Sequence, residues 1–435
     1  MPSLRSEQIM NKSSILVLVV VMTTNFSVAQ TEPTPSPMEL PGNYEELPEL
    51  KASEILKPEF LAGTYFKVQE DVPTQTGCNR FSIESDFGAF EAEGNEMLIR
   101  RIKEINAIAQ LKEVSRTDEY KNALVKAAKA PVAAAKNIVT DPVHAVASVP
   151  KGIMKFMGRI GETAKSVRQK QEGKDPEGSQ LQQVIGFSDT KRKVAMSLGV
   201  DPYSSNAVLQ HELDGISWAA FAGGATFSLA TLPIGGGAAT ALTVTQVSGD
   251  LDQMLKEKSP ADLKILNRRV LIALGASEKD AERFLNNNAF SPTAQTAFVL
   301  NLKSMNGVAN RGAFVRLAGE TSSSEADAIF CVQTASLMSA INKNEKPLAR
   351  LVTFGDFPVG VAKDGRTVVA LQWDYAAWTS GAGRFSAKLQ EFAAKPPGNG
   401  KVFVAVSGET SPRLRQELET RGDIVQDRLS PGPLK

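Results

Sequence analysis

Short segments that alternate apolar and polar residues occupy the N-terminal third of the chain, and a helical spacing follows them. TYFKV, RFSIE and GAFEAE, all within residues 64–93, alternate in this way and predict strands. DVPTQTG and SDFG between them predict turns. Apolar residues then recur every three or four positions from Leu98 to Leu111, which predicts a half-buried helix. We therefore expect a small β element over residues 59–95.

Helical patterns continue through residues 96–345, which we expect to form one helical domain. Four serines in this range precede helix-compatible residues and are able to cap free N–H groups: Ser259, Ser277, Ser291 and Ser324. Gly275 suits the end of one helix shortly before the next cap.

The period changes again over residues 346–435. ARLVTF, VGVAK, TVVALQW, KVFVAV and DIVQDRL resemble strands, and RFSAKLQEFAAK and SPRLRQELETRG resemble helices. Asp364-Gly365 between VGVAK and TVVALQW predicts a hairpin. These elements predict a small C-terminal α/β domain, and the whole chain is expected to be an α+β protein that is predominantly helical.

The N-terminus has the features of a bacterial export signal over residues 1–29. Lys12 is basic, residues 15–22 are uniformly apolar, and Ser27-Val28-Ala29 provides small residues before a cleavage site. Translation starts at Met1 or Met10. Residues 30–58 begin with a proline-rich stretch and are expected to be a linker. The product is therefore expected in the periplasm or outside the cell.

Residues 215–249 contain no Asp, Glu, Lys, Arg or His. Pro233 and the glycines at 235–237 predict a turn between two arms, at 216–231 and 238–248. As helices the arms would be about 24 and 17 Å long, shorter than the hydrocarbon core of about 30 Å. We expect a buried helical hairpin, with membrane insertion and a ligand-lining or disordered run as the alternatives.

Residues 121–174 are the most basic part of the chain, with eleven Lys or Arg against three acidic residues. Prolines separate short amphipathic segments in this belt. It is able either to lie on an anionic membrane or a protein partner, or to wrap the protein's own core. The residues expected to make the surface contact are Lys151, Lys155, Phe156, Arg159, Lys165 and Arg168.

Composition excludes several functional classes. Removing residues 1–29 changes the formal net charge from +1 to 0, which does not suit a nucleic-acid-binding protein. The two cysteines, Cys78 and Cys331, exclude a disulfide-rich scaffold. They form either one long-range disulfide or two separate thiols.

Catalytic and cofactor motifs are missing. The chain has no phosphate-binding loop, no complete dinucleotide fingerprint and no nucleophile elbow. Its two histidines, His144 and His211, are too few for a three-histidine metal site. His211 and Asp214 share a helical face, but a polar helix edge explains them. No metal or cofactor is expected.

Three acidic residues at predicted strand ends are the remaining catalytic candidates: Asp356, Asp374 and Glu409. Strand ends often carry functional sites in α/β folds, and three carboxylates are able to support acid–base or metal chemistry. The leading hypothesis is an exported, non-enzymatic envelope protein that binds a protein partner or an anionic membrane. An enzyme with this acidic site and a membrane-inserting effector are the alternatives.

Overall fold

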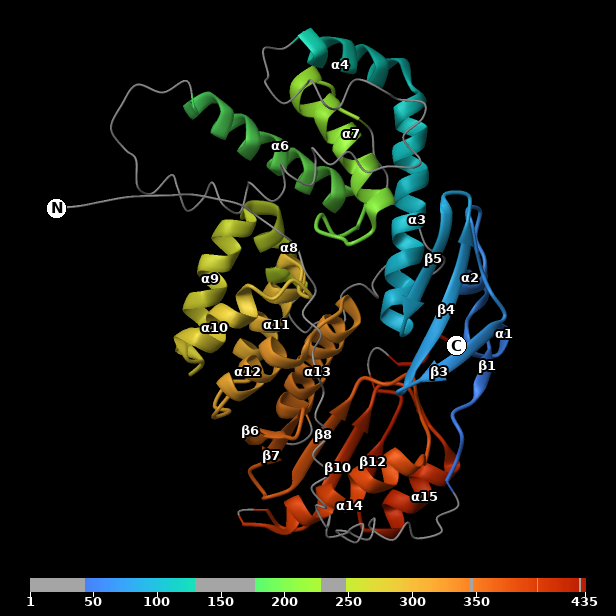
Figure 1. Ribbon diagram of the computed structural model, residues 1–435, viewed down its shortest axis with the longest axis vertical. Coiled ribbons are helices and arrows are strands. Elements are labelled where there is room, and N and C mark those ends of the chain that lie inside the picture. Colours follow the sequence, from blue (N-terminus) through green and yellow to red (C-terminus); the bar gives the residue numbers. More distant parts are fainter. Residues whose placement is uncertain (1–43, 130–176, 228–247, 345–346, 397, 430–431) are drawn as a thin grey trace, which may run out of the picture. The chain divides into compact units, whose positions relative to one another are not determined.

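An antiparallel sheet forms the N-terminal part of the fold (Figure 1). The computed structural model describes residues 44–129, 177–227, 248–344, 347–396, 398–429 and 432–435. The strand order is β1-β3-β4-β2, with β5 paired to β4. The elements are β1 (Glu49–Lys51), α1 (Ala52–Ile55), α2 (Pro58–Leu61), β2 (Phe66–Val68), β3 (Asp71–Gln75), β4 (Cys78–Ser85) and β5 (Gly88–Glu93).

Helix α3 (Asn95–Arg116) leaves this sheet and contributes to two cores. Its first half packs Leu98, Ile99 and Ile102 against the sheet. Its second half packs Ile108 and Leu111 against the next helices. Those helices are α4 (Asp118–Lys129), α6 (Glu177–Ser197) and α7 (Ala207–Gly223).

A second group of helices follows, and it packs against the C-terminal sheet. The helices are α8 (Ser248–Glu257), α9 (Pro260–Ala273), α10 (Glu278–Leu285), α11 (Pro292–Ser304), α12 (Gly312–Thr321) and α13 (Glu325–Asn344). Four phenylalanines, Phe284, Phe290, Phe298 and Phe314, form the centre of their core.

The C-terminal sheet is buried on both faces. Its strand order is β12-β10-β8-β7-β6, and β8, β10 and β12 are parallel. Val368, Ala370 and Phe403 face the core of the second helical group, whereas neighbouring Val369 and Val404 face α14 and α15. Burial on both faces explains why these strands are almost continuously apolar. The elements are β6 (Leu348–Phe354), β7 (Phe357–Ala362), β8 (Thr367–Leu371), β9 (Tyr375–Ala376), α14 (Ser380–Ala394), β10 (Val402–Val406), β11 (Glu409–Thr410), α15 (Pro412–Thr420) and β12 (Ile424–Gln426).

The structure confirms the α+β, predominantly helical fold class and many of the local predictions. Ser259, Ser277 and Ser291 cap α9, α10 and α11 through their hydroxyl groups. Asp364-Gly365 lies in the β7–β8 hairpin turn.

Two predictions near the N-terminus differ from the structure. Residues Asp71–Gln75, predicted as part of a turn, form strand β3, in which Val72 and Thr74 are buried and alternate with exposed residues. The expected linker over residues 30–58 belongs to the fold from Tyr44 onward, because β1 pairs with β3 and Ala52 is buried.

The boundary expected near residue 345 does not separate two cores. Residues 44–435 form one compact unit, and a single apolar cluster runs from Leu271 in α9 to Ala405 in β10. Helices α14 and α15 cover only one face of the C-terminal sheet, so α12 and α13 are needed to cover the other.

The described start of the uncharged run 215–249 is buried. Ile216, Trp218 and Ala219 lie in the core side of α7, and Gly223 packs directly on the backbone of Ala123 in α4. Residues 228–247 lie outside the described residues. Among the helices that the structure describes, none is both long and apolar enough to cross a membrane.

Candidate functional site

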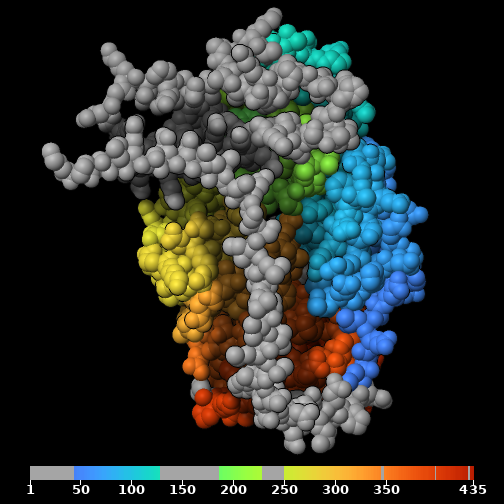
Figure 2. All heavy atoms as spheres, viewed as in Figure 1, coloured from blue at the N-terminus to red at the C-terminus, as the bar shows by residue number. Residues whose placement is uncertain are grey.

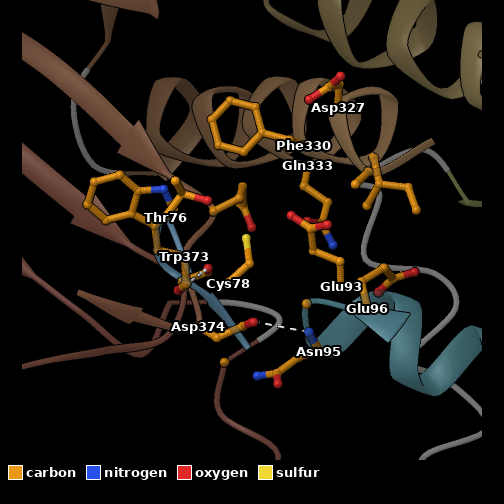
Figure 3. A pocket seen from close by; sticks show the side chains of 16 residues that line it. Thr76, Cys78, Glu93, Asn95, Glu96, Asp327, Phe330, Gln333, Trp373 and Asp374 are labelled. Atoms are coloured by element: carbon orange, nitrogen blue, oxygen red, sulfur yellow. Dashed lines mark hydrogen bonds between the residues drawn. The ribbon is translucent and has the colours of Figure 1, made fainter. Parts of the chain in front are cut away.

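A pocket of about 150 Å³ lies where the N-terminal sheet, the start of α3, the first turns of α13 and the ends of β8 and β10 meet (Figure 3). On the face of the molecule that Figure 2 shows, residues of the N-terminal sheet (blue) lie beside residues of the C-terminal sheet and its helices (orange to red). The lining side chains of the pocket that bear on its chemistry are Cys78, Glu93, Glu96, Asp327, Phe330, Gln333, Trp373, Asp374 and Ser407.

The β3–β4 turn presses against Trp373 and defines one wall of the pocket. Gly77 has a φ of +86°, and a Cβ atom at this position would lie 2.3 Å from the Trp373 ring. Only glycine meets both requirements. The carbonyl of Gly77 accepts a hydrogen bond from the Asp374 backbone N–H at 2.8 Å, which joins the turn to the C-terminal sheet.

Asp374 connects three segments of the chain. Its carboxylate accepts hydrogen bonds from the backbone N–H groups of Asn79 at 2.8 Å and Asn95 at 3.1 Å. Asn95 is the first residue of α3, so the carboxylate also lies at the positive end of a helix dipole. Burial raises the pKa of Asp374 to about 6, although the two amide hydrogen bonds oppose the rise. Both oxygens are therefore engaged in holding the fold together.

Cys78 lies beside Asp374 with its sulfur toward the middle of the pocket (Figure 3). Burial raises the pKa of this thiol to about 12, and the charges of Asp374 and Glu93 add to the rise. The thiol is therefore neutral at pH 7.

Glu93 and Glu96 lie on the α3 side of the pocket (Figure 3). Glu93 forms a long, exposed ion pair of 3.6 Å with Arg80. Glu96 has a buried Oε2 atom without a hydrogen-bond partner. Burial raises the pKa of Glu96, and the positive charges of Arg100 and Lys103 oppose this.

Helix α13 supplies the opposite wall. Asp327 accepts hydrogen bonds from the backbone N–H groups of Ser323 and Ser324. These bonds lower its pKa even though burial opposes them. Gln333 points toward Glu93 across the pocket (Figure 3). The ring of Phe330 packs on that of Phe357, with 5.8 Å between the ring centroids.

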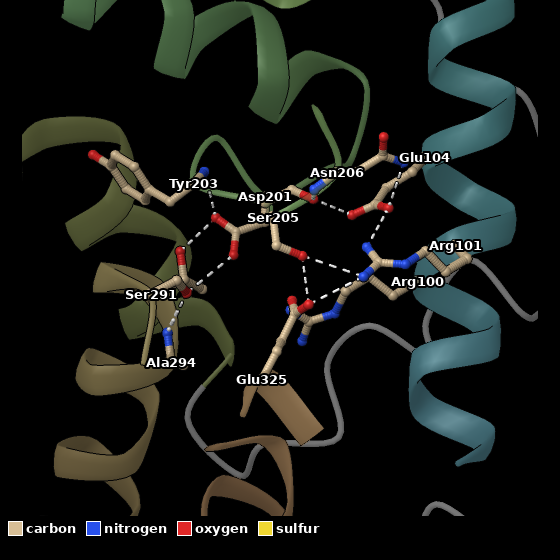
Figure 4. Close-up of polar contacts among 12 residues, drawn as sticks. Arg100, Arg101, Glu104, Asp201, Tyr203, Ser205, Asn206, Ser291, Ala294 and Glu325 are labelled. Carbon is tan, nitrogen blue, oxygen red and sulfur yellow. Dashed lines mark hydrogen bonds and ion pairs between the residues drawn. The ribbon is translucent and has the colours of Figure 1, made fainter. Parts of the chain in front are cut away.

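A second polar centre lies further along α3, and its carboxylates are paired with guanidinium, amide and hydroxyl groups (Figure 4). Glu104 is buried and accepts hydrogen bonds from Arg101 at 2.7 Å, from Asn206 at 3.0 Å and from Ser204. Arg101 also pairs with Glu325 at 3.0 Å, in the first turn of α13. This network connects α3 to α13 and to the loop before α7.

Of the three predicted catalytic acids, the structure brings Asp374 alone into the pocket. Asp356 is exposed in the β6–β7 turn at the same edge of the sheet. Glu409 lies beside Asp374 through its backbone, but its carboxylate pairs with Arg428 at 3.0 Å. The three carboxylates therefore do not form one cluster.

The other predicted residues have different outcomes. Both cysteines are free: Cys78 lines the pocket, and buried Cys331 contacts Ser322. The long-range disulfide that the sequence left open is not formed. The predicted surface residues Lys151, Lys155, Phe156, Arg159, Lys165 and Arg168 lie outside the described residues.

The two acidic residues of the HELD segment in α7 have different partners. Asp214 forms a buried ion pair with Lys191 at 2.5 Å, and Glu212 pairs with Lys112 at 2.8 Å. His211 is exposed. In the described part of the chain, no group of three His, Cys, Asp or Glu residues is arranged to hold a metal ion.

Comparison with known proteins gives no relative: no family model, curated protein or solved structure matches this chain. A functional assignment must therefore come from the chemistry of the pocket itself.

Sequence reasoning found Asp374 at a strand end but missed most of the pocket. Glu93 and Glu96 belong to the end of a strand and the start of a helix, where acidic residues are common. Gln333 and Phe330 occupy one helix among several with similar patterns. The adjacent Trp373-Asp374 pair after a buried strand was the available signal.

Proposed function

We propose that this protein is an exported, non-enzymatic binding protein of the bacterial envelope, and that the pocket beside Trp373 is a ligand-binding site. The observation that carries the proposal is that the Cys78 thiol is neutral and that Asp374 and Ser407 are already engaged in hydrogen bonds with the backbone. A nucleophilic cysteine needs a lowered pKa, whereas the pKa of Cys78 is raised.

The other polar groups support binding over catalysis for the same reason. Asp374 uses both carboxylate oxygens on backbone amides, and the Ser407 hydroxyl donates to the backbone carbonyl of Trp373 at 3.0 Å. Walls from four separate segments instead provide shape and fixed polar groups, as binding sites require.

Ligand binding is tested by thermal unfolding of residues 30–435 in the presence of amines, carboxylates, polyols and nucleotides. A ligand raises the melting temperature according to its concentration and affinity. We expect one of these ligand classes to raise the melting temperature of the unchanged protein. The Gln333→Trp variant, whose larger side chain fills the pocket, should show no such rise. The control Gln69→Trp places the same side chain at an exposed position and keeps the response. Turnover that depends on Cys78 or Asp374 would contradict the proposal.

We also propose, from the sequence, that the basic belt 121–174 contacts an anionic membrane or a protein partner. Vesicles that contain phosphatidylglycerol should co-sediment the protein, and vesicles of phosphatidylcholine should not. A triple change of Lys151, Lys155 and Lys165 to Gln should abolish co-sedimentation. The matched control changes the exposed Lys256, Lys279 and Lys388 to Gln and should bind as the unchanged protein does. Equal loss in both variants would show that net charge alone is responsible.

A further inference from the structure

The charge of the pocket lining is entirely negative. Glu93, Glu96, Asp327 and Asp374 line it, whereas no Lys, Arg or His is among the described lining residues. The whole chain has a formal net charge of only +1. The negative lining is therefore a local feature and does not follow from an acidic composition.

The protein compensates these four carboxylates unequally. Asp374 and Asp327 accept hydrogen bonds from backbone amides. Glu93 has one exposed pair at 3.6 Å. The Oε2 atom of Glu96 is buried with no hydrogen-bond donor. A buried acceptor without a donor is rare and costs free energy, so the Glu96 carboxylate gains a donor if its side chain turns toward a ligand N–H group in the pocket.

Aromatic rings complete the lining. Trp373 lies on one side of the pocket and Glu93 and Glu96 on the other, with Cys78 and Gln333 between them (Figure 3). The Trp373 ring offers apolar surface on which the carbon chain of a ligand packs. The volume of about 150 Å³ resembles that of a cavity able to hold benzene, which limits the ligand to a small molecule.

We propose that the pocket binds a small primary ammonium ion, with its N–H groups directed at Glu96 and Glu93 and its carbon chain toward Trp373. This inference rests on the proposed ligand-binding function and names its ligand class. A primary ammonium has three N–H donors, whereas a quaternary ammonium has none and leaves Oε2 of Glu96 unpaired. A bare divalent cation is disfavoured because the described residues contain no metal-binding group of three His, Cys, Asp or Glu.

Isothermal titration calorimetry of residues 30–435 tests this directly. The probes are n-pentylamine, its neutral isostere n-pentanol, the quaternary ammonium tetramethylammonium, and magnesium chloride. We expect n-pentylamine to bind at least about tenfold more tightly than n-pentanol, because a charge-assisted hydrogen bond is about twice as strong as a neutral one. Tetramethylammonium, which has no hydrogen-bond donor, should bind more weakly than n-pentylamine.

Two variants and one control locate the site. Glu96→Gln keeps the shape of the side chain and should weaken n-pentylamine binding about tenfold. Trp373→Leu should weaken it several-fold. The control Glu91→Gln removes an exposed carboxylate from the same strand as Glu93, outside the pocket, and should have no effect. A melting curve of each variant checks that it folds, and Glu96→Gln remains informative if Trp373→Leu does not.

The outcomes separate this inference from the proposed function. Equal binding of n-pentylamine and n-pentanol, or preferred binding of tetramethylammonium or magnesium, would overturn the inference but leave a ligand-binding pocket. Amine binding that Glu96→Gln leaves unchanged would also overturn it. Failure of every ligand class in both this titration and the thermal screen would overturn the proposed function as well.

Discussion

Two polar centres on the same helix differ in how their charges are balanced. Around Glu104, carboxylates and guanidinium groups of α3 and α13 pair with one another and with neighbouring polar groups (Figure 4). Around Glu96, two turns earlier, four carboxylates surround a pocket without a cation in its lining (Figure 3). A paired centre contributes to stability, whereas an unbalanced one is characteristic of a binding site.

Removal of one charge tests the paired centre. Glu104→Gln removes the charge that Arg101 faces, and Arg101 is only 11% exposed. Breaking a buried ion pair on one side costs about 3 kcal/mol where the remaining charge has no other partner. Arg101 keeps its pair with Glu325, so the free energy of unfolding in urea should fall by about 2 kcal/mol. Glu113→Ala, at an exposed position of the same helix, should cost less than about 1 kcal/mol. Equal losses in the two variants would mean that the network adds little stability.

Asp374 should make stability depend on pH. Its pKa in the folded protein is about 6, compared with an ordinary value of 3.8. The folded state therefore holds this proton more tightly than the unfolded state. The associated stability is fully present below pH 3.8 and is lost as the pH rises through about 6, by about 3 kcal/mol in total.

The variant Asp374→Asn isolates this contribution. Unfolding free energies of both proteins, measured between pH 4 and pH 7, should show the unchanged protein losing about 2.4 kcal/mol relative to the variant, most of the total. Asp423, whose pKa burial also raises to about 6, is present in both proteins and cancels. Parallel pH profiles would show that Asp374 titrates normally.

Gly77 tests the wall that joins the N-terminal turn to the pocket. Gly77→Ala should lower the unfolding free energy by about 2 kcal/mol more than Gly88→Ala does. Both glycines have positive φ angles, but only a Cβ at position 77 would meet a neighbouring group, the Trp373 ring. The difference between the two variants thus measures the contact alone. If Gly77→Ala and Gly88→Ala lowered the unfolding free energy by similar amounts, backbone strain alone would explain both losses, and the contact with Trp373 would contribute nothing.

The smallest expected effect is a gain in stability, and it bears directly on the difference between the centres around Glu96 and Glu104. Glu96→Gln should raise the unfolding free energy at pH 7 by up to about 1 kcal/mol, because it removes a buried and poorly compensated charge. The same substitution at Glu104 should be strongly destabilising. A native residue that lowers the free energy of unfolding of its own protein is typical of a functional site. A destabilising Glu96→Gln would instead place Glu96 among the structural residues.

Local pattern was sufficient for much of the fold. Helix caps such as Ser259 and Ser291 and the Asp364-Gly365 hairpin depend on neighbours within a few residues, and the structure confirms them. Strand β3 was missed because Asp71 and Pro73 are typical of turns. Its burial depends on pairing with β1 and β4, which local composition does not reveal.

The amino-acid sequence by itself determined the fold class, the ends of many elements and the absence of familiar catalytic motifs, because these follow from the spacing of apolar residues and from short-range capping. Tertiary structure alone decided the pocket. Asp374 meets Asn79 across 295 residues of chain, and α13 meets the end of β5 across a similar distance. Such long-range contacts bring the four carboxylates together in a pocket whose lining has no cation. A local pattern of residues does not encode these contacts.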